Sequence, residues 1–177
     1  MLVFCQVRIH WSARLFCLAV LAAMAISMPA AFGDTVDKAG LAISRFDFRD
    51  TSGEHRDQTA EHARRLEDVA ATLLAILSAN EKIRPVALNC TNGGCSARTS
   101  GLEHLSAAAA AAGARFLLVG EVHKTSTLVG WIKFAVLDLR GKTATCDRFL
   151  TYRGDTDEAW HRAAEFAGRD IERNCIP

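Results

Sequence analysis

Three segments of the chain carry apolar residues at the spacing of helices. From residue 58 to 79, apolar side chains recur in steps of three and four, which predicts an amphipathic helix. Its expected buried stripe is Ala63, Leu66, Ala70, Leu73 and Leu77, with Glu61, Arg64, Arg65, Glu67 and Asp68 on the other side. A second helix is predicted from about 99 to 112, an alanine-rich stretch closed by Gly113.

The third helix is predicted to begin at Asp155 or Thr156. Asp155 and Glu158 have the spacing of a capping box, in which side chains at both positions satisfy free backbone N–H groups. The apolar stripe that follows consists of Trp160, Ala163, Ala167 and Ile171.

Shorter apolar segments predict strands. These segments are 40–48, 83–88, 116–119, 128–139 and 143–152. Pro85 cannot donate to a strand ladder, so its strand is expected at an edge or to begin there. The unbroken apolar run 116–119 is typical of a strand buried on both faces. Residues 140–142 are expected to turn the last two strands into a hairpin.

The order strand, helix, strand, helix, strand, strand, strand, helix predicts an α/β fold. We expect one mixed sheet of four or five strands, with three helices packed on it. No proline-rich linker or internal repeat divides the region from 34 to 177. This region is therefore expected to form a single domain with its own core.

The first 33 residues have a different pattern. A basic stretch is followed by an apolar run from 15 to 28 and by small residues just before Asp34. This order predicts a secretory signal peptide at 1–33, and the run is short of the ~20 residues that span a membrane. The region from 34 to 177 is then expected in the periplasm, without a membrane span.

Charge argues against two classes of partner. Removal of residues 1–33 leaves 19 basic and 20 acidic residues, a net charge of −1. A protein without a basic excess does not attract nucleic acid or an anionic membrane surface.

Four cysteines remain after signal removal, and an oxidising compartment makes them disulfide candidates. Cys90 and Cys95 enclose a short glycine-rich loop, with four residues between them instead of the two of thioredoxin-type pairs. This spacing favours a structural disulfide over a thiol-redox centre. Cys146 and Cys175 are then left for each other. Four cysteines allow three connectivities, so this pairing is a hypothesis based on proximity.

No catalytic signature is present. The histidines lack H-x-x-x-H and H-E-x-x-H spacing, and no G-x-S-x-G nucleophile elbow occurs. Gly141-Lys142-Thr143 resembles the end of a phosphate-binding loop, but Val136 stands where that motif needs glycine. We therefore expect no catalytic residue, no cofactor and no metal ligand set, although a metal site assembled from distant segments stays an alternative.

Two polar clusters flank predicted elements. One follows the first strand at 47–53, and the other precedes the last helix at 153–157. They suit either loop capping with surface ion pairs, or a recognition surface at the rim of the sheet. The candidate contact residues are Asp47, Arg49, Asp50, Arg153, Asp155 and Asp157.

Four strings of the sequence resemble an uncharacterised family of secreted alphaproteobacterial proteins, a domain of unknown function. They are 46–52 (FDFRDTS), 113–116 (GARF), 120–126 (GEVHKTS) and 153–160 (RGDTDEAW). The element order is also similar to the TolB amino-terminal domain and to the periplasmic domains of CsgG-like and penicillin-binding-protein-activator proteins. This resemblance implies a domain that binds other proteins, and it supplies no catalytic residues.

The sequence thus favours a non-catalytic periplasmic interaction module of the cell envelope or of an exported enzyme system. Its expected partner is another periplasmic or envelope protein. The alternatives are a small-molecule or metal-binding periplasmic protein and, less favoured, a thiol-redox protein that uses Cys90 and Cys95.

Overall fold

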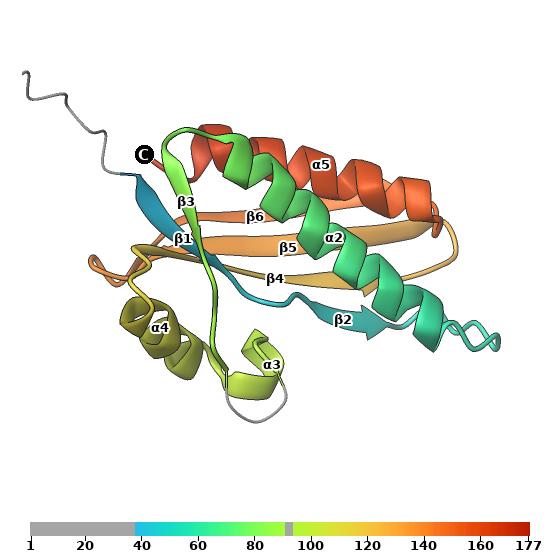
Figure 1. Ribbon diagram of the computed structural model, residues 1–177. Coiled ribbons are helices and arrows are strands. Elements are labelled where there is room, and N and C mark those ends of the chain that lie inside the picture. The colour runs from blue at the N-terminus through green and yellow to red at the C-terminus, as the bar shows by residue number, and fades with distance from the viewer. Residues whose placement is uncertain (1–37, 91–93) are drawn as a thin grey trace, which may run out of the picture. The chain divides into compact units, whose positions relative to one another are not determined.

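A six-stranded mixed sheet forms the centre of residues 38–90 and 94–177, the part of the chain that the computed structural model describes (Figure 1). The strands are β1 (Ala39–Ile43), β2 (Asp47–Asp50), β3 (Ile83–Val86), β4 (Phe116–Lys124), β5 (Val129–Asp138) and β6 (Thr143–Arg153). The helices are α2 (Thr59–Ala79), α3 (Ala97–Ser100), α4 (Leu102–Ala111) and α5 (Asp157–Asn174). The predicted α/β fold is confirmed, with more strands and helices in these residues than expected. The predicted signal peptide, 1–33, lies outside them.

The sheet order is β3-β1-β4-β5-β6, and β2 also pairs with β4. The pairs β1–β3, β1–β4 and β2–β4 are parallel, whereas β4–β5 and β5–β6 are antiparallel. Strand β3, which contains Pro85, lies at the edge of the sheet as predicted. The hairpin between β5 and β6 is also confirmed.

The single strand predicted at 40–48 is wrong. Strands β1 and β2 both pair with β4, but the three residues 44–46 lie opposite only two, Val119 and Gly120. This bulge turns Phe46 into the core, where its ring covers Gly120. A Cβ on Gly120 would lie 2.4 Å from that ring, so glycine is required at this position.

The helix predicted at 99–112 is divided in two. Gly101, at φ 78°, separates α3 from α4, because this backbone conformation interrupts a right-handed helix. Ser96 caps α3 by accepting a hydrogen bond from the Thr99 N–H. Gly113, at φ 81°, follows the end of α4, as the sequence predicted.

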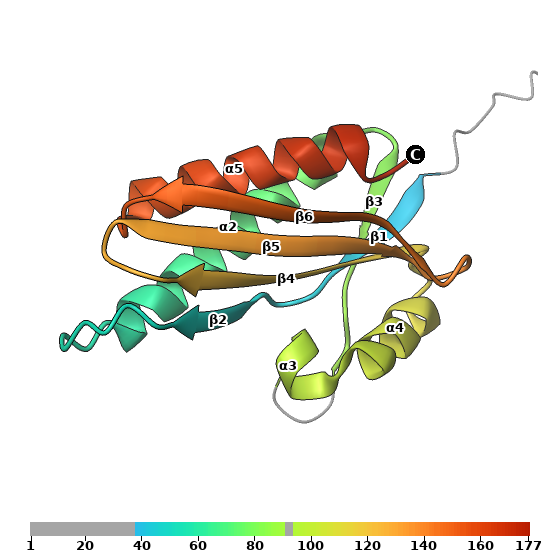
Figure 2. The ribbon, with the colours of Figure 1, turned by 180° about the vertical axis from the view of Figure 1, so that it is seen from behind.

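Helices α2 and α5 cover one face of the sheet, and Figure 2 shows the opposite face of β4, β5 and β6. The predicted stripe of α5 is buried. The predicted stripe of α2 is only partly correct, because the buried residues are His62, Arg65, Val69, Leu73 and Leu77. Two polar side chains thus occupy the core-facing side of its first half.

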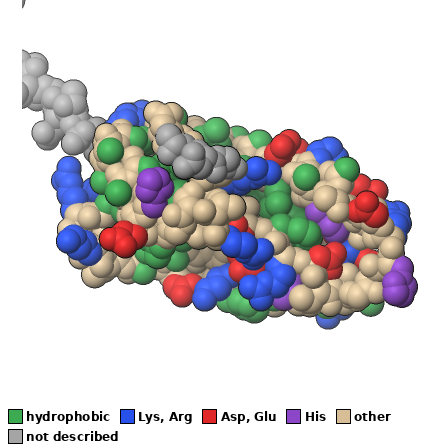
Figure 3. Space-filling model, turned by 90° about the horizontal axis from the view of Figure 1, so that it is seen from below, with side chains coloured by type: hydrophobic (Ala, Val, Ile, Leu, Met, Phe, Trp, Pro, Cys, Tyr) green, Lys and Arg blue, Asp and Glu red, His purple; other side chains and the backbone are tan. Residues whose placement is uncertain are grey.

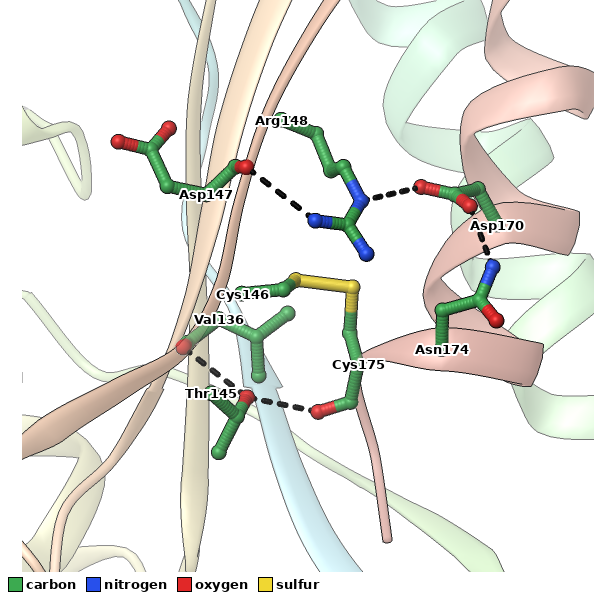
Figure 4. The surroundings of a disulfide bond; sticks show 8 residues. All are labelled: Val136, Thr145, Cys146, Asp147, Arg148, Asp170, Asn174 and Cys175. Atoms are coloured by element: carbon green, nitrogen blue, oxygen red, sulfur yellow. Dashed lines mark hydrogen bonds and ion pairs between the residues drawn. A yellow bond between two sulfur atoms is a disulfide. The ribbon is translucent and has the colours of Figure 1, made fainter.

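The last helix is tied to the last strand by the Cys146–Cys175 disulfide (Figure 4). Beside it, the Thr145 hydroxyl donates to the Cys175 carbonyl at 2.6 Å. Arg148 Nε donates to Asp170 at 3.1 Å and makes a second tie between β6 and α5. The other disulfide joins Cys90 to Cys95, so the structure contains both of the hypothesised pairs.

Candidate functional site

Lys124, the last residue of β4, is a buried charge surrounded by acidic side chains. Its side chain is only 2% exposed. Its Nζ lies 2.9 Å from Asp155 Oδ2 and 3.8 Å from Asp50 Oδ2, and it also donates to Glu54 and Gln58. The ammonium group therefore joins β4 to the end of β2, to the loop before α2 and to the residues before α5.

Asp155 is the acidic counterpart of Lys124, and its side chain is 9% exposed. Besides the lysine, its carboxylate accepts hydrogen bonds from His62 Nε2 at 3.2 Å and from Arg65 Nη1 at 2.9 Å. Trp160 Nε1 donates to it at 2.9 Å. Four side chains from three elements thus satisfy one buried carboxylate.

We call Lys124, Asp155 and the side chains bonded to them the ion network. Both Lys124 and Asp155 stay charged at neutral pH. Burial by itself would raise the pKa of Asp155, but the hydrogen bonds from Lys124, His62 and Trp160 and the charge of Arg65 lower it to about 2. Burial would likewise lower the pKa of Lys124, yet its bonds to Glu54 and Asp155 raise it. A general acid or base needs a pKa near the working pH, so neither group suits proton transfer at neutrality.

The capping box predicted from Asp155 is not formed. The cap of α5 is Thr156, whose side chain accepts from the Ala159 N–H. Asp155 turns instead toward Lys124, because a buried ion pair satisfies its carboxylate with stronger, charge-assisted bonds.

The structure distributes the six predicted contact residues among separate roles. Asp50 and Asp155 meet at Lys124, while Asp157 pairs with Arg64 at 2.7 Å and Arg65 at 2.8 Å. The two polar clusters therefore do come together, but Asp155 is buried between them and Asp157 is held by arginines.

Asp47 and Arg49 lie on the other side of β2. Asp47 accepts from the Ser96 hydroxyl at 2.6 Å and from the Arg98 N–H at 2.9 Å, which fixes the start of α3. Arg49 Nε lies 3.1 Å from Glu121, to which Arg98 also donates at 3.0 Å. Arg153, at the end of β6, is exposed.

Sequence reasoning did not assign Lys124, His62 and Arg65 to a site. A signal for Lys124 existed: it continues the alternation of Leu118, Gly120 and Val122, all on the core-facing side of β4. For His62 and Arg65 the helical spacing to Val69 and Leu73 was available, but their polarity argued against burial.

A row of aromatic side chains crosses the face of the sheet that is turned away from the core residues Val122 and Ile132. His123 on β4 contacts Trp131 on β5 at 4.6 Å between ring centroids, and Trp131 contacts Phe149 on β6 at 5.2 Å. Thr51 Oγ1 lies 2.7 Å from His123 Nε2 at one end of the row. Phe149, at the other end, is 59% exposed. We call His123, Trp131 and Phe149 the aromatic row.

Charged side chains lie at the β2 end of this face. Glu121 neighbours His123 two residues along β4, on the same side of the strand, and carries the ion pairs to Arg49 and Arg98. Figure 3 shows basic side chains gathered beside acidic ones in the middle of the adjoining surface. Aromatic and arginine side chains thus occur together at the margin of the sheet.

A pocket of about 540 Å³ lies between the loop before α2 and strand β2. Its lining includes Arg45, Phe48, Glu54, Arg56 and His62. Among the described residues, no group of three or more His, Cys, Asp or Glu side chains is placed to hold a metal ion. Nor does any helix in those ranges have the length and apolarity to cross a membrane.

Solved structures to which this chain is similar come from several bacteria. The hypothetical protein CT253 from Chlamydia trachomatis is 10% identical, with a TM-score of 0.54 over 78% of this chain and 98% of that one. TolB from Acinetobacter baumannii is 11% identical, with a TM-score of 0.48 over 80% of this chain and 29% of its own. The LpoB C-terminal domain from Salmonella enterica is 11% identical, with a TM-score of 0.39 over 76% of this chain and 90% of that one. At these identities the likeness to CT253 concerns the fold alone.

No curated protein matches the sequence. A family model described as a protein of unknown function (DUF2380) matches residues 39–171, and the chain therefore belongs to this family, DUF3280.

Proposed function

We propose that this protein is a non-catalytic periplasmic interaction module that binds another periplasmic or envelope protein. The observation that carries the proposal is the aromatic row, which lies on a sheet face that α2 and α5 leave open and which ends in the exposed ring of Phe149. Aromatic and arginine side chains are the types most enriched at the energetic centres of protein interfaces.

The ion network supports an interaction role more than a chemical one. Lys124 and Arg65 each bond to Asp155 and to other acidic neighbours instead of directing unpaired groups into a cavity. Such a network holds β2, β4, α2 and α5 in fixed positions at one end of the sheet. A rigid sheet face loses little conformational freedom when a partner binds.

Some of the predicted contact residues lie on the proposed binding surface. Arg49 borders the aromatic row through Glu121, and Arg153 lies on β6 on the same side as Phe149. Asp47 fixes the start of α3 through Ser96 and Arg98. Asp50 and Asp157 are held in ion pairs on the helix-covered side, with Lys124 and with the arginines of α2. Asp155 is assigned to the ion network instead, since its buried carboxylate has no access to a partner.

Site-specific photo-crosslinking in the native periplasm tests the proposal. A photoreactive residue is placed at Lys133, which lies on the open face of β5, and at the exposed Leu74 on α2 as the matched control. We expect a discrete crosslinked protein from position 133 and none from position 74. Trp131→Thr, which keeps a strand-forming residue, should remove that crosslink.

Equal crosslinking from both positions would contradict a specific binding surface on the open face. Crosslinks absent from position 133, together with a small molecule that co-purifies, would favour a ligand-binding protein with the 540 Å³ pocket as its site. Elemental analysis of the same preparation covers the metal-binding alternative. For the redox alternative, replacing Cys90 and Cys95 by serine should abolish activity while the fold persists.

A further inference from the structure

Strand β6 forms a long edge of the sheet. It spans Thr143–Arg153, pairs with β5 along one side, and is the last strand in the sheet order, so no described strand occupies its other side. Edge strands are usually short or interrupted by proline, because their free backbone N–H and C=O groups invite another strand. β6 has 11 residues, with no proline and no glycine.

Exposed phenylalanines lie on both sides of this edge. Phe149 belongs to the open face, and Phe166 on α5 is 57% exposed on the helix-covered side. Between β6 and α5 lies a groove of about 560 Å³ that both rings line, with Arg153 and Arg162 as its charged residues. Another strand added to β6 would cover apolar surface above and below the sheet.

We propose that a second copy of this chain occupies the edge, by antiparallel pairing of β6 with β6 about a twofold axis at Leu150. The two sheets would then form one continuous sheet across the dimer. A twofold interface is self-complementary, so each contact occurs twice. Because the axis is perpendicular to the sheet, both α5 helices lie on the same side and both aromatic rows on the other.

Charge complementarity selects this register. Residues opposite each other in an antiparallel pair lie on the same face of the sheet. The twofold axis between the two strands must therefore lie level with one residue, which then faces its own copy. With the axis at Leu150, Asp147 lies opposite Arg153 of the second copy, and Phe149 lies opposite Thr151. Both Asp147 and Arg153 are exposed in the single chain, and Asp147 has only a 3.9 Å contact with Lys133.

The two registers centred nearer the start of β6 are less favourable. An axis at Arg148 places the two Arg148 side chains opposite each other, and like charges in that position are destabilising. An axis at Phe149 places Asp147 opposite Thr151 and leaves both Asp147 and Arg153 without a cross-strand ion pair. The Leu150 register alone among these three forms two opposite-charge pairs.

Charge reversal with sedimentation equilibrium on the protein purified from the periplasm tests the dimer. The wild type should sediment as a dimer. Asp147→Arg and Arg153→Asp should each weaken dimerisation by about tenfold or more, since either substitution sets two like-charge pairs across the axis. The double variant D147R/R153D reverses both charges and should restore the dimer.

The control variant is Glu103→Arg, an equal charge change at an exposed position of α4, which should leave the dimer unchanged. Circular dichroism of each variant establishes that it is folded. A wild type that remains monomeric at about 100 μM, a concentration far above the dissociation constant of a functional dimer, would overturn the proposal. So would a folded double variant that dimerises as weakly as the single variants. These measurements use the protein alone, so they do not depend on the partner of the open face.

Discussion

At the scale of single residues, the ion network explains how the chain tolerates a lysine and an aspartate in its interior. Removing an ion from water costs several kcal/mol, and the cost is offset only when partners and hydrogen bonds are in place. Asp155 has four side-chain donors, and Lys124 has Asp155, Glu54 and Gln58. Lys124 and Asp155 are thus stable in the interior only while all of these partners are in place.

Loss of one member should be costly. Asp155→Asn keeps the size of the side chain but leaves Lys124 and Arg65 without their shared counter-charge. We expect a loss of about 3 kcal/mol in the free energy of unfolding, measured by urea denaturation. Asp157→Asn is the matched control, and because Asp157 is exposed it should cost under about 1 kcal/mol. Equal effects of the two substitutions would contradict the network.

The low pKa of Asp155 predicts an acid-sensitive fold. Because its pKa falls from an ordinary 3.8 to about 2 in the folded protein, the unfolded chain binds the proton more readily. The stabilisation is complete above about pH 4 and is lost as the pH falls through about 2, an effect of about 2 kcal/mol. Urea unfolding between pH 5 and 2 should show this loss in the wild type. The Asp155→Asn variant should lack that part of the pH dependence.

At the scale of elements, helix α5 is held to the sheet in two ways. Its apolar stripe packs on the core, and the Cys146–Cys175 disulfide fastens its end to β6 (Figure 4). Both cysteines are buried, at 7% and 1% exposed. The last strand and last helix therefore act as one unit at this end of the domain.

The two disulfides should contribute unequally to stability. The sequence separation is 29 residues for Cys146–Cys175 and 5 residues for Cys90–Cys95. In the chain-entropy model, the longer loop contributes about 3.5 kcal/mol and the shorter about 2 kcal/mol. Replacing each pair by alanine and measuring urea unfolding should give losses in that order. The reverse order would show that the glycine-rich loop supports more of the fold than its length implies.

At the scale of the whole molecule, the domain presents a different surface on each side. Helices α2 and α5 cover one face of the sheet, and α4 packs with Leu105 and Ala109 against Leu117 on the other. The aromatic row lies farther along that second face. The part of this face beyond α4 is left uncovered by helices, and it is the surface that we propose for a partner.

Export should produce a chain that begins at Asp34. We expect mass spectrometry of periplasmic protein to give the mass of residues 34–177 with four fewer hydrogens than the reduced form, since both disulfides form in an oxidising compartment. A version that starts at residue 34 and stays in the cytoplasm should retain its thiols and unfold at lower urea concentration. Recovery of an uncleaved chain from the periplasm would contradict the predicted signal peptide.

The sequence by itself determined the fold class, the edge position of Pro85, the hairpin of the last two strands and the buried stripe of α5. These features follow from local spacing, because apolar periodicity and turn residues act over a few positions. The cysteine pairing could also be hypothesised from the sequence, because the glycine-rich loop favours Cys90 with Cys95 and leaves Cys146 and Cys175 for each other.

Only the tertiary structure decided where the charges lie. Lys124, His62 and Asp155 are 31 or more residues apart along the chain, and each has an ordinary polar setting in the sequence. They become neighbours because β4, α2 and the start of α5 meet at one end of the sheet. The same long-range packing separated β1 from β2 through Phe46 and Gly120, and it drew Asp155 away from the expected cap. Burial of a charge depends on partners brought from distant segments, and a local pattern does not contain them.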